Sequence, residues 1–139
     1  MVRIAHALAL SLAALSLTAC MTTPAEQPVT VTGQITYRER IALPPTAPVE
    51  ITLADVSLMD VPAKTIALQR FTADGRQVPF AFSLTVDQRP FDPRHSYAVS
   101  ARISDASGRL MFITDTRNSV AFDGRRAIDM GMLVLVKTN

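Results

Sequence analysis

Few residues in this chain have side chains suited to covalent or acid–base chemistry. Cys20 is the only cysteine among 139 residues, and the two histidines are His6 and His95. A thiolate is a strong nucleophile, so Cys20 is a candidate for covalent modification. Once Cys20 is modified, no thiol remains for a disulfide bond, for nucleophilic catalysis or for a zinc site.

His95 is the one candidate for a general base outside the N-terminal segment. An activated hydroxyl must lie within hydrogen-bond reach of such a base, and Ser96 is only its neighbour in sequence. The segment Asp92-Pro93-Arg94-His95 is typical of a solvated loop, and we favour that interpretation over a catalytic role.

The acidic residues form no recognisable metal-binding motif. Zinc needs three or four ligands from cysteine, histidine and carboxylates, which one histidine and scattered aspartates do not supply. Calcium loops use closely spaced aspartates, and the candidates Asp55, Asp60, Asp87, Asp92, Asp105 and Asp115 lack that spacing. We expect turn and strand-end roles for them, and we predict no catalytic residue, no metal and no cofactor.

The first twenty residues have the layout of a secretory signal. Arg3 gives a positive start, and a mostly apolar run extends from Ile4 to Leu17. This run is shorter than the roughly 20 apolar residues of a membrane-spanning helix and fits the core of a signal peptide. The L-T-A-C sequence that ends at Cys20 resembles the lipobox of bacterial lipoproteins. In that class the cysteine thiol receives a diacylglycerol, a peptidase cuts before the cysteine, and the new amino group is acylated.

The lipobox resemblance divides the chain into three parts. Residues 1–19 form a cleaved helical lipoprotein signal peptide, residues 20–28 form the lipidated N-terminus and a tether, and residues 29–139 form one β-sandwich domain. Several acyl chains hold a protein stably on a bilayer. Lipoproteins kept in the inner membrane carry aspartate after the cysteine, and Met21 stands there instead. We therefore expect attachment to the outer membrane, on its periplasmic face. The alternative is an ordinary signal peptide with a chance cysteine.

The composition of the mature chain gives no sign of a nucleic-acid-binding surface, and we expect no nucleic-acid partner. Removal of residues 1–19 leaves 120 residues, the usual size of one domain, with 13 basic and 12 acidic side chains. Such a balance does not predict the clustered basic face of a nucleic-acid-binding protein. For the arginines we favour strand-edge charges that block aggregation over a basic patch for anionic lipid or an acidic peptide.

Apolar and polar residues alternate from Val29 onward, which is the pattern of half-buried strands. The predicted strands cover about 29–38, 49–53, 64–71, 78–87, 97–103, 109–114 and 130–136. We expect Ile66 and Leu68 to face inward, whereas the last strand has apolar residues in both phases, which leaves its register open. Pro79 lacks a backbone donor, so a sheet edge or a bulge is expected there.

No stretch after the signal has a long helical period, and turn signals recur at roughly 8–15-residue spacing. We therefore predict an all-β fold, a single immunoglobulin-like or transthyretin-like β-sandwich of about seven strands with its core between two sheets. Tyr97 is either a corner tyrosine bonded to nearby backbone or an ordinary half-buried aromatic. Phe91 is either an exposed contact residue or a plug at the end of the sandwich.

Three segments carry a family resemblance. They contain the G-x-I-x-Y-R-x-R-I-x-L-P and L-x-D-V-S motifs between Val29 and Asp60, the sequence VPFAFSL from Val78, and the Y-x-V-x-A-R-I motif from Tyr97. The chain resembles the YbaY/YscW family of lipoproteins over residues 29–122. The resemblance implies a small β-sandwich lipoprotein, and it supplies no catalytic residues to carry over to this chain. One branch of the family comprises pilotins, which help a type III secretion secretin to reach and assemble in the outer membrane, and the other comprises envelope lipoproteins of unsettled role.

The expected function is a non-enzymatic envelope binding or assembly factor. Its partners would be membrane lipid, through acylated Cys20, and an outer-membrane protein such as a secretin. The narrow version is a pilotin of a type III secretion system. A glycan- or lipid-binding envelope module is the alternative, which is weakened because sugar platforms usually need aromatic faces and the chain has no tryptophan and two tyrosines, Tyr37 and Tyr97. A hydrolase is the least favoured class.

Overall fold

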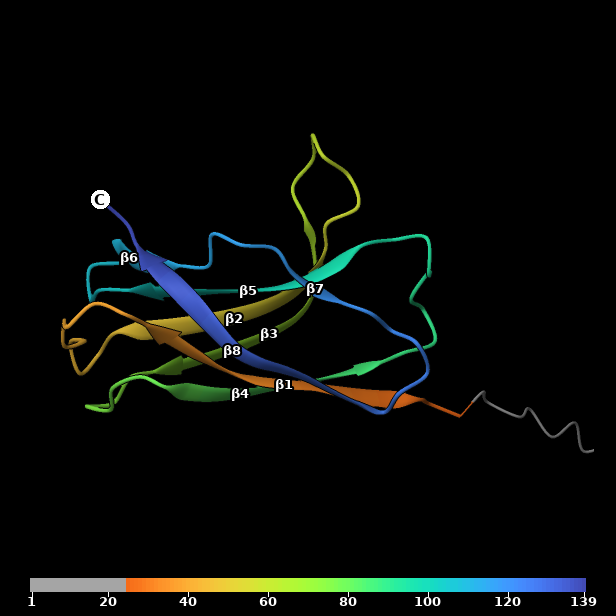
Figure 1. Cartoon of the computed structure of the whole chain (residues 1–139), viewed down its shortest axis with the longest axis horizontal. Coiled ribbons are helices and arrows are strands. Elements are labelled where there is room, and N and C mark those ends of the chain that lie inside the picture. Colours follow the sequence, from red (N-terminus) through yellow and green to blue (C-terminus); the bar gives the residue numbers. More distant parts are fainter. Residues whose placement is uncertain (1–24) are drawn as a thin grey trace, which may run out of the picture.

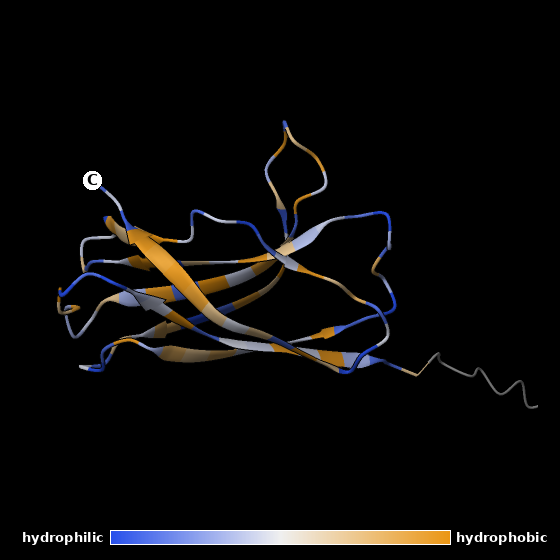
Figure 2. Ribbon diagram, in the orientation of Figure 1, coloured by the Kyte–Doolittle hydropathy of each residue, from blue (hydrophilic) through white to orange (hydrophobic). Residues whose placement is uncertain are grey.

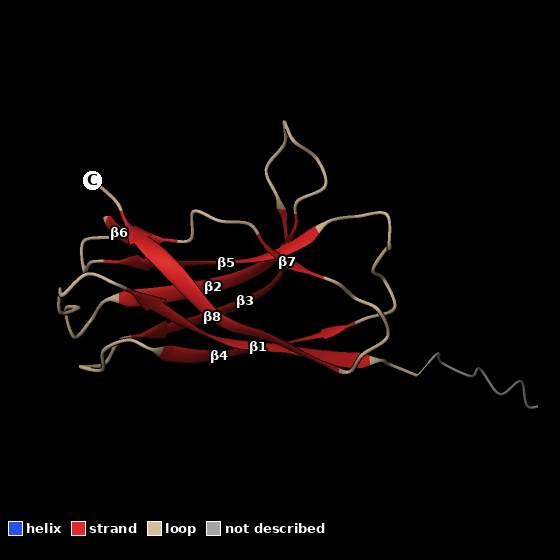
Figure 3. Ribbon diagram, viewed as in Figure 1, coloured by secondary structure: helices blue, strands red, loops and turns tan. Residues whose placement is uncertain are grey.

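The computed structural model describes residues 25–139, so the predicted signal peptide and Cys20 lie outside the described part of the chain. The described residues form strands and loops (Figures 1 and 3). The strands are β1 (Pro28–Tyr37), β2 (Pro48–Asp55), β3 (Lys64–Thr72), β4 (Phe80–Asp87), β5 (Tyr97–Ser104), β6 (Leu110–Ile113), β7 (Asn118–Val120) and β8 (Ala127–Lys137). Over residues 25–139 there is no helix long and apolar enough to cross a membrane.

The strands follow one hydrogen-bonded path in the order β3-β2-β5-β6-β8-β1-β4, with β7 paired to β5. β8 is the junction of this path, because it runs parallel to β1 while its C-terminal end pairs antiparallel with β6. The two ends of the path, β3 and β4, contact each other. There the Gln69 side chain accepts a hydrogen bond from the Ser83 backbone N–H at 2.9 Å. The sheet is thus nearly closed into a barrel.

The all-β class is confirmed, but the immunoglobulin-like or transthyretin-like sandwich of about seven strands is not. The two sheets of a sandwich meet through side chains, whereas here β8 joins both halves of the path through backbone pairing. The strand that the sequence did not predict is β7, whose three residues are too few to show an alternation. Pro79 directly precedes β4, which is the last strand of the path. This agrees with the sheet edge that we predicted there, because proline has no backbone N–H to donate.

The core fills the inside of the curved sheet. Val49, Ile51 and Leu53 of β2 are fully buried, as their alternation predicted, and the inward rows of β4 and β5 are buried as well. Among the described residues, no charged side chain is buried. The Phe112 ring of β6 stacks on the ring of Tyr37 in β1, with centroids 3.9 Å apart. This stack connects two strands that are distant in sequence.

The inward face of β8 changes phase in the middle of the strand. Ile128 and Met130 contact the core before Gly131, and Leu133 and Leu135 contact it afterwards. The change coincides with an irregularity in the pairing of β8 with β1. Gly131 has a φ of 65°, a conformation that glycine adopts without steric cost. This bulge explains why the inward residues of β8 change phase, whereas the apolar side chains of Met132 and Val134 are exposed.

Gly33 lies opposite that bulge and has no room for a side chain. A Cβ on Gly33 would come within 2.7 Å of the Phe82 ring and 2.9 Å of the Gly131 carbonyl oxygen. We expect Gly33→Ala to lower the free energy of unfolding by about 1–3 kcal/mol, as overpacked core sites do, measured by urea denaturation. Ser83→Thr on the exposed face of β4 is the matched control. Equal stability of Gly33→Ala and wild type would contradict this packing.

The prediction for Leu68 is wrong, although Ile66 contacts the core as expected. Leu68 is 41% exposed. In the pairing with β2, Ala67 faces Leu53 and Thr65 faces Ala54, so Ile66 is an extra residue between them. A bulge of this kind shifts the alternation by one position, which turns Leu68 outward.

The start of β1 and three loops lie at the same ends of the strands, although loop 56–63 projects sideways from the long axis (Figure 1). Pro28, the first residue of β1, pairs with Asp87, the last residue of β4. Asp55, the last residue of β2, pairs with Tyr97, the first residue of β5. We call this end the tether end, because the predicted tether leads into β1 there (Figure 1). Its loops are residues 56–63, 88–96 and 121–126.

Candidate functional site

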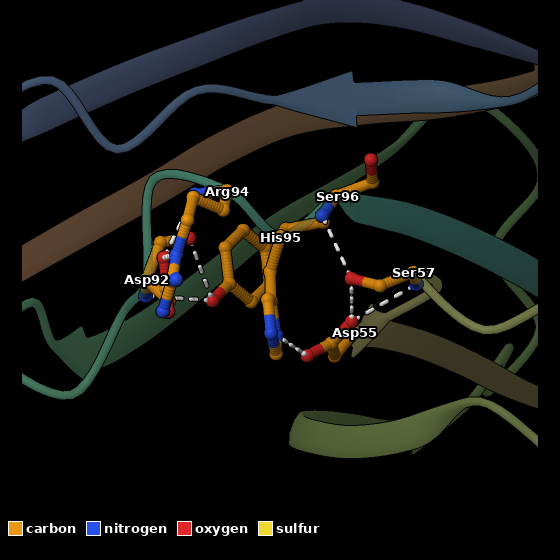
Figure 4. Close-up of polar contacts among 7 residues, drawn as sticks. Asp55, Ser57, Asp92, Arg94, His95 and Ser96 are labelled. Carbon is orange, nitrogen blue, oxygen red and sulfur yellow. Dashed lines mark hydrogen bonds and ion pairs between the residues drawn. The ribbon is translucent and has the colours of Figure 1, made fainter.

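A polar cluster at the tether end fastens loop 56–63 to loop 88–96 (Figure 4). Asp55 Oδ2 lies 2.7 Å from His95 Nδ1. The other carboxylate oxygen of Asp55 accepts hydrogen bonds from the N–H and the hydroxyl of Ser57. Ser57 Oγ in turn accepts from the Ser96 N–H at 2.9 Å, and the Val56 N–H donates to the Ser96 carbonyl at 2.8 Å. We call Asp55, Ser57, His95 and Ser96 the loop clamp.

The loop clamp follows from where the strands end. Asp55 closes β2, and Ser57 donates to it from two positions later, as in an Asx turn. His95 arrives from the opposite side because loop 88–96 folds back onto Tyr97. The Tyr97 hydroxyl accepts the Asp92 N–H at 2.9 Å and donates to the Asp92 carbonyl at 3.3 Å. Of the two interpretations of Tyr97, the corner tyrosine is therefore confirmed.

The loop clamp keeps the Asp55 carboxylate charged. The hydrogen bonds from the Ser57 hydroxyl and N–H, followed by the bond with His95, lower the pKa of Asp55 from an ordinary 3.8 to about 2. Donors that bind only the charged form of a carboxylate have this effect. The Asp55 side chain is 19% exposed and that of His95 is 47% exposed, so the clamp lies at the protein surface.

The geometry of the loop clamp differs from that of a catalytic relay. In a relay the nucleophilic hydroxyl bonds one nitrogen of the imidazole and the carboxylate orients the ring from the other. Here the Ser57 hydroxyl donates to Asp55, and among residues 25–139 no hydroxyl is bonded to the His95 ring. Over the same range, no group of three or more histidine, cysteine or acidic residues could hold a metal ion. The clamp is suited to joining two loops.

The loop clamp should make folding stability depend on pH in the acid range. Because the pKa of Asp55 is lowered to about 2, the unfolded carboxylate takes up a proton at a higher pH than the folded one. The contribution of the clamp is therefore complete above about pH 5 and is lost as the pH falls from about 4 to 2. We expect Asp55→Asn to unfold at lower urea than wild type at pH 7, with the difference shrinking toward pH 2.

His95→Gln is the matched variant for this measurement. It removes the smaller hydrogen-bond contribution and leaves both Ser57 donors in place. The variant should therefore keep most of the acid dependence of wild type. A stability difference between Asp55→Asn and wild type that stays constant from pH 7 to 2 would show that the clamp does not hold the carboxylate charged.

Three aromatic rings close the tether end beside the loop clamp. The rings of Phe91 and Phe122 stack with centroids 3.8 Å apart, and Tyr97 meets both of them edge to face. Phe91 is therefore a plug, the second of its two predicted roles. A hollow of about 380 Å³ beside these rings is lined in part by Ile66 and His95. Its volume lies at the small end of the range for ligand sites.

Most arginines of the tether end are paired with nearby aspartates. Three aspartates each form an ion pair with the arginine two positions later, and the pairs are Asp87–Arg89, Asp92–Arg94 and Asp123–Arg125. Hydrogen bonds from these arginines lower the pKa of each aspartate. The three arginines do not form a basic patch free of acidic partners, which weakens the basic-patch interpretation at this end.

The structure describes some of the residues that the sequence singled out for chemistry and not others. Cys20 lies outside the described residues and stays a prediction. His95 lies in the expected loop, but no sequence signal pointed to its partner Asp55, 40 residues earlier. A search for a hydroxyl two positions after a strand-ending aspartate would have found Ser57. The hydroxyl of Tyr37, which donates to the Ile41 carbonyl at 2.6 Å, was also missed.

Fold and site together define a small all-β domain whose main polar cluster joins loops. The sequence identifies the family of this domain. The chain belongs to the YscW family of type III secretion system lipoprotein chaperones, whose model matches residues 26–132. The resemblance drawn from the motifs is thereby confirmed.

Two relatives support the assignment. The chain is 35% identical to the uncharacterized lipoprotein YbaY of Escherichia coli (strain K12) over 115 residues, 83% of this chain. The match spans 60% of the length of YbaY. The chain is also similar to the solved structure of an alternative pilotin from the type II secretion system of Vibrio cholerae, with a TM-score of 0.67 and 46% identity. That match covers 80% of this chain and 99% of the pilotin chain.

Proposed function

We propose that this protein is a lipid-anchored lipoprotein on the periplasmic face of the outer membrane that acts as a pilotin-like assembly factor for a secretin. Cys20 carries the lipid, residues 1–19 are the cleaved signal, and residues 20–28 are the tether. The domain binds its client protein and performs no catalysis. The acyl chains bring the bound client to the outer membrane.

One observation carries the proposal, the similarity to a solved pilotin. An identity of 46% with a match over 99% of the pilotin chain leaves little of that domain without a counterpart here. The family description refers to type III secretion and the solved relative to type II secretion. We therefore propose the role that the two share, a lipoprotein chaperone, with a secretin as client and without assignment to one secretion system.

The site favours this role over the two alternatives that the sequence left open, a hydrolase and a glycan-binding module. The Ser57 hydroxyl donates to a carboxylate and not to an imidazole, which weakens the hydrolase hypothesis. Tyr37 and Tyr97 are each only 7% exposed, and both hydroxyls bond backbone groups. Since sugar platforms need accessible aromatic faces, neither tyrosine suits a glycan-binding module.

Secretin localisation in cells tests the proposal. Deletion of the gene should move the secretin from the outer-membrane fraction of a density gradient to the inner-membrane fraction, and a plasmid copy should restore it. A copy with Cys20→Ser separates binding from delivery, because it should still co-purify with the secretin yet fail to restore its location. An unchanged secretin distribution in the deletion strain would refute the assembly role.

A further inference from the structure

The loop between β2 and β3 exposes apolar side chains at its tip. Met59 is 94% exposed, Leu58 70% and Val61 51%, and these are the most exposed large apolar residues of the described chain. Figure 1 shows this loop standing away from the body of the molecule, and Figure 2 shows its apolar stretches in orange. Single exposed apolar residues are common on protein surfaces, whereas three within four positions of one tip mark an interaction site.

The base of this loop is held in place. The loop clamp bonds Asp55 and Ser57, on one side of the base, to His95 and Ser96 of loop 88–96. The Val56 N–H adds a backbone bond to the same neighbour. The apolar tip is therefore carried on a fastened stem that holds it away from the core.

The position of the loop relative to the tether limits what its tip can reach. Loop 56–63 and the first residue of β1 lie at the same ends of the strands, but the loop projects sideways from the long axis, whereas the chain enters β1 at the end of that axis (Figure 1). Eight residues lead from Cys20 to Pro28, and a fully extended chain of that length spans at most about 29 Å. A lipid on Cys20 therefore keeps the start of β1 close to the bilayer surface, and the domain can tilt so that the tip of loop 56–63 meets the same surface.

The chemistry of the tip suits lipid better than a charged surface. The tip is convex, so it can enter a bilayer interface without a complementary groove. Asp60 lies between Met59 and Val61, and its carboxylate disfavours anionic surfaces and limits burial to the headgroup level, about 5–10 Å deep for interfacial elements. Of the four arginines in the neighbouring loops, three are paired with aspartates, which leaves little basic attraction.

We propose that Leu58, Met59 and Val61 insert into the interface of the bilayer that holds acylated Cys20, as a second membrane contact. This inference rests on the lipid anchor of the proposed function. The contact fixes the orientation of the domain on the membrane, because two attachment points leave less rotational freedom than a single tether. It depends on apolar burial and not on charge, so it is insensitive to ionic strength, which screens only charge-mediated binding.

A fluorescent probe at the loop tip tests the proposal in the full lipidated protein. Because Cys20 is acylated, Met59→Cys supplies the only free thiol for an environment-sensitive dye such as NBD. In vesicles of phosphatidylethanolamine and phosphatidylcholine, we expect blue-shifted emission and loss of most of it when bromine-labelled lipid is included, equally in low and high salt. Ala106→Cys, in the exposed turn between β5 and β6 at the opposite end, is the matched control and should keep its aqueous emission.

Flotation of the same vesicles separates the two proposals. If the protein floats but the Met59 probe stays in an aqueous environment, the second membrane contact is refuted while the anchor stands. If the protein does not float, the lipid anchor fails and this inference fails with it. If Leu58→Ser together with Val61→Ser leaves quenching at position 59 unchanged, the apolar tip is not what inserts.

Discussion

Replacing Cys20 by serine is expected to abolish lipid attachment and with it the association of the protein with the outer membrane. A serine hydroxyl is not ionised at neutral pH, whereas a thiol yields the thiolate that takes up the lipid. Each buried methylene contributes about 0.8 kcal/mol to membrane binding, so several acyl chains hold a protein that a bare tip of three side chains cannot hold. Incorporation of radiolabelled palmitate should fall to background in the variant, and the protein should leave the outer-membrane fraction.

Met21→Asp is the matched variant for this experiment. It leaves Cys20 and the whole β domain unchanged, so it should take up palmitate normally. Since aspartate in that position retains bacterial lipoproteins in the inner membrane, the labelled protein should move to the inner-membrane fraction. Palmitate on Cys20→Ser would refute the assignment of the lipid site, and an unmoved Met21→Asp protein would refute only the sorting prediction.

The second large effect is expected for Phe112→Ala. Phe112 is 1% exposed, and its ring stacks on Tyr37 in a parallel arrangement. β6 has four residues and pairs with β8 at Phe112 and Ile113, so Phe112 lies where the two halves of the strand path join. Truncation of a buried phenylalanine costs about 3–5 kcal/mol, a large part of the roughly 5–15 kcal/mol that stabilises a domain. Urea denaturation should show a loss of this size.

Met132→Ala serves as the control for Phe112→Ala. Met132 lies in β8 but is 50% exposed, so its truncation should change the free energy of unfolding by no more than about 0.5 kcal/mol, as for other surface substitutions. Phe112→Leu should recover part of the stability, because it keeps an apolar side chain at the junction. A loss for Phe112→Ala as small as that for Met132→Ala would mean that β6 does not connect the halves of the sheet.

Alternation of apolar residues was enough to predict which strands exist and most of their inward faces. It failed at bulges, because the extra residue at Ile66 and the glycine at position 131 shift the phase without any change in composition. It also could not predict that β8 pairs with both β1 and β6, since period-two patterns say which face is buried but not which strand is adjacent. The sandwich prediction was not confirmed for this reason.

The candidate site was predictable only in its local parts. The turn around Asp92 and the bonded hydroxyl of Tyr97 involve residues five positions apart. The two alternatives that the sequence offered for Tyr97 therefore included the correct one. The contact of Asp55 with His95 joins loops 40 residues apart and depends on the pairing of β2 with β5. The L-x-D-V-S motif that indicated the family includes Asp55 and Ser57, although the motif by itself did not reveal what they bind.

The position of β8 in the strand path has a consequence for the order of events in biogenesis. β8 is the last strand of the described chain, yet it lies between β6 and β1. Synthesis proceeds from the N-terminus. The β1–β4 pair and the β3-β2-β5-β6 part of the sheet therefore cannot be joined through β8 until residues 127–137 are present. Under the proposed export, a chain that cannot complete its fold early would stay suited to threading through a membrane pore and would fold after residues 127–137 had emerged.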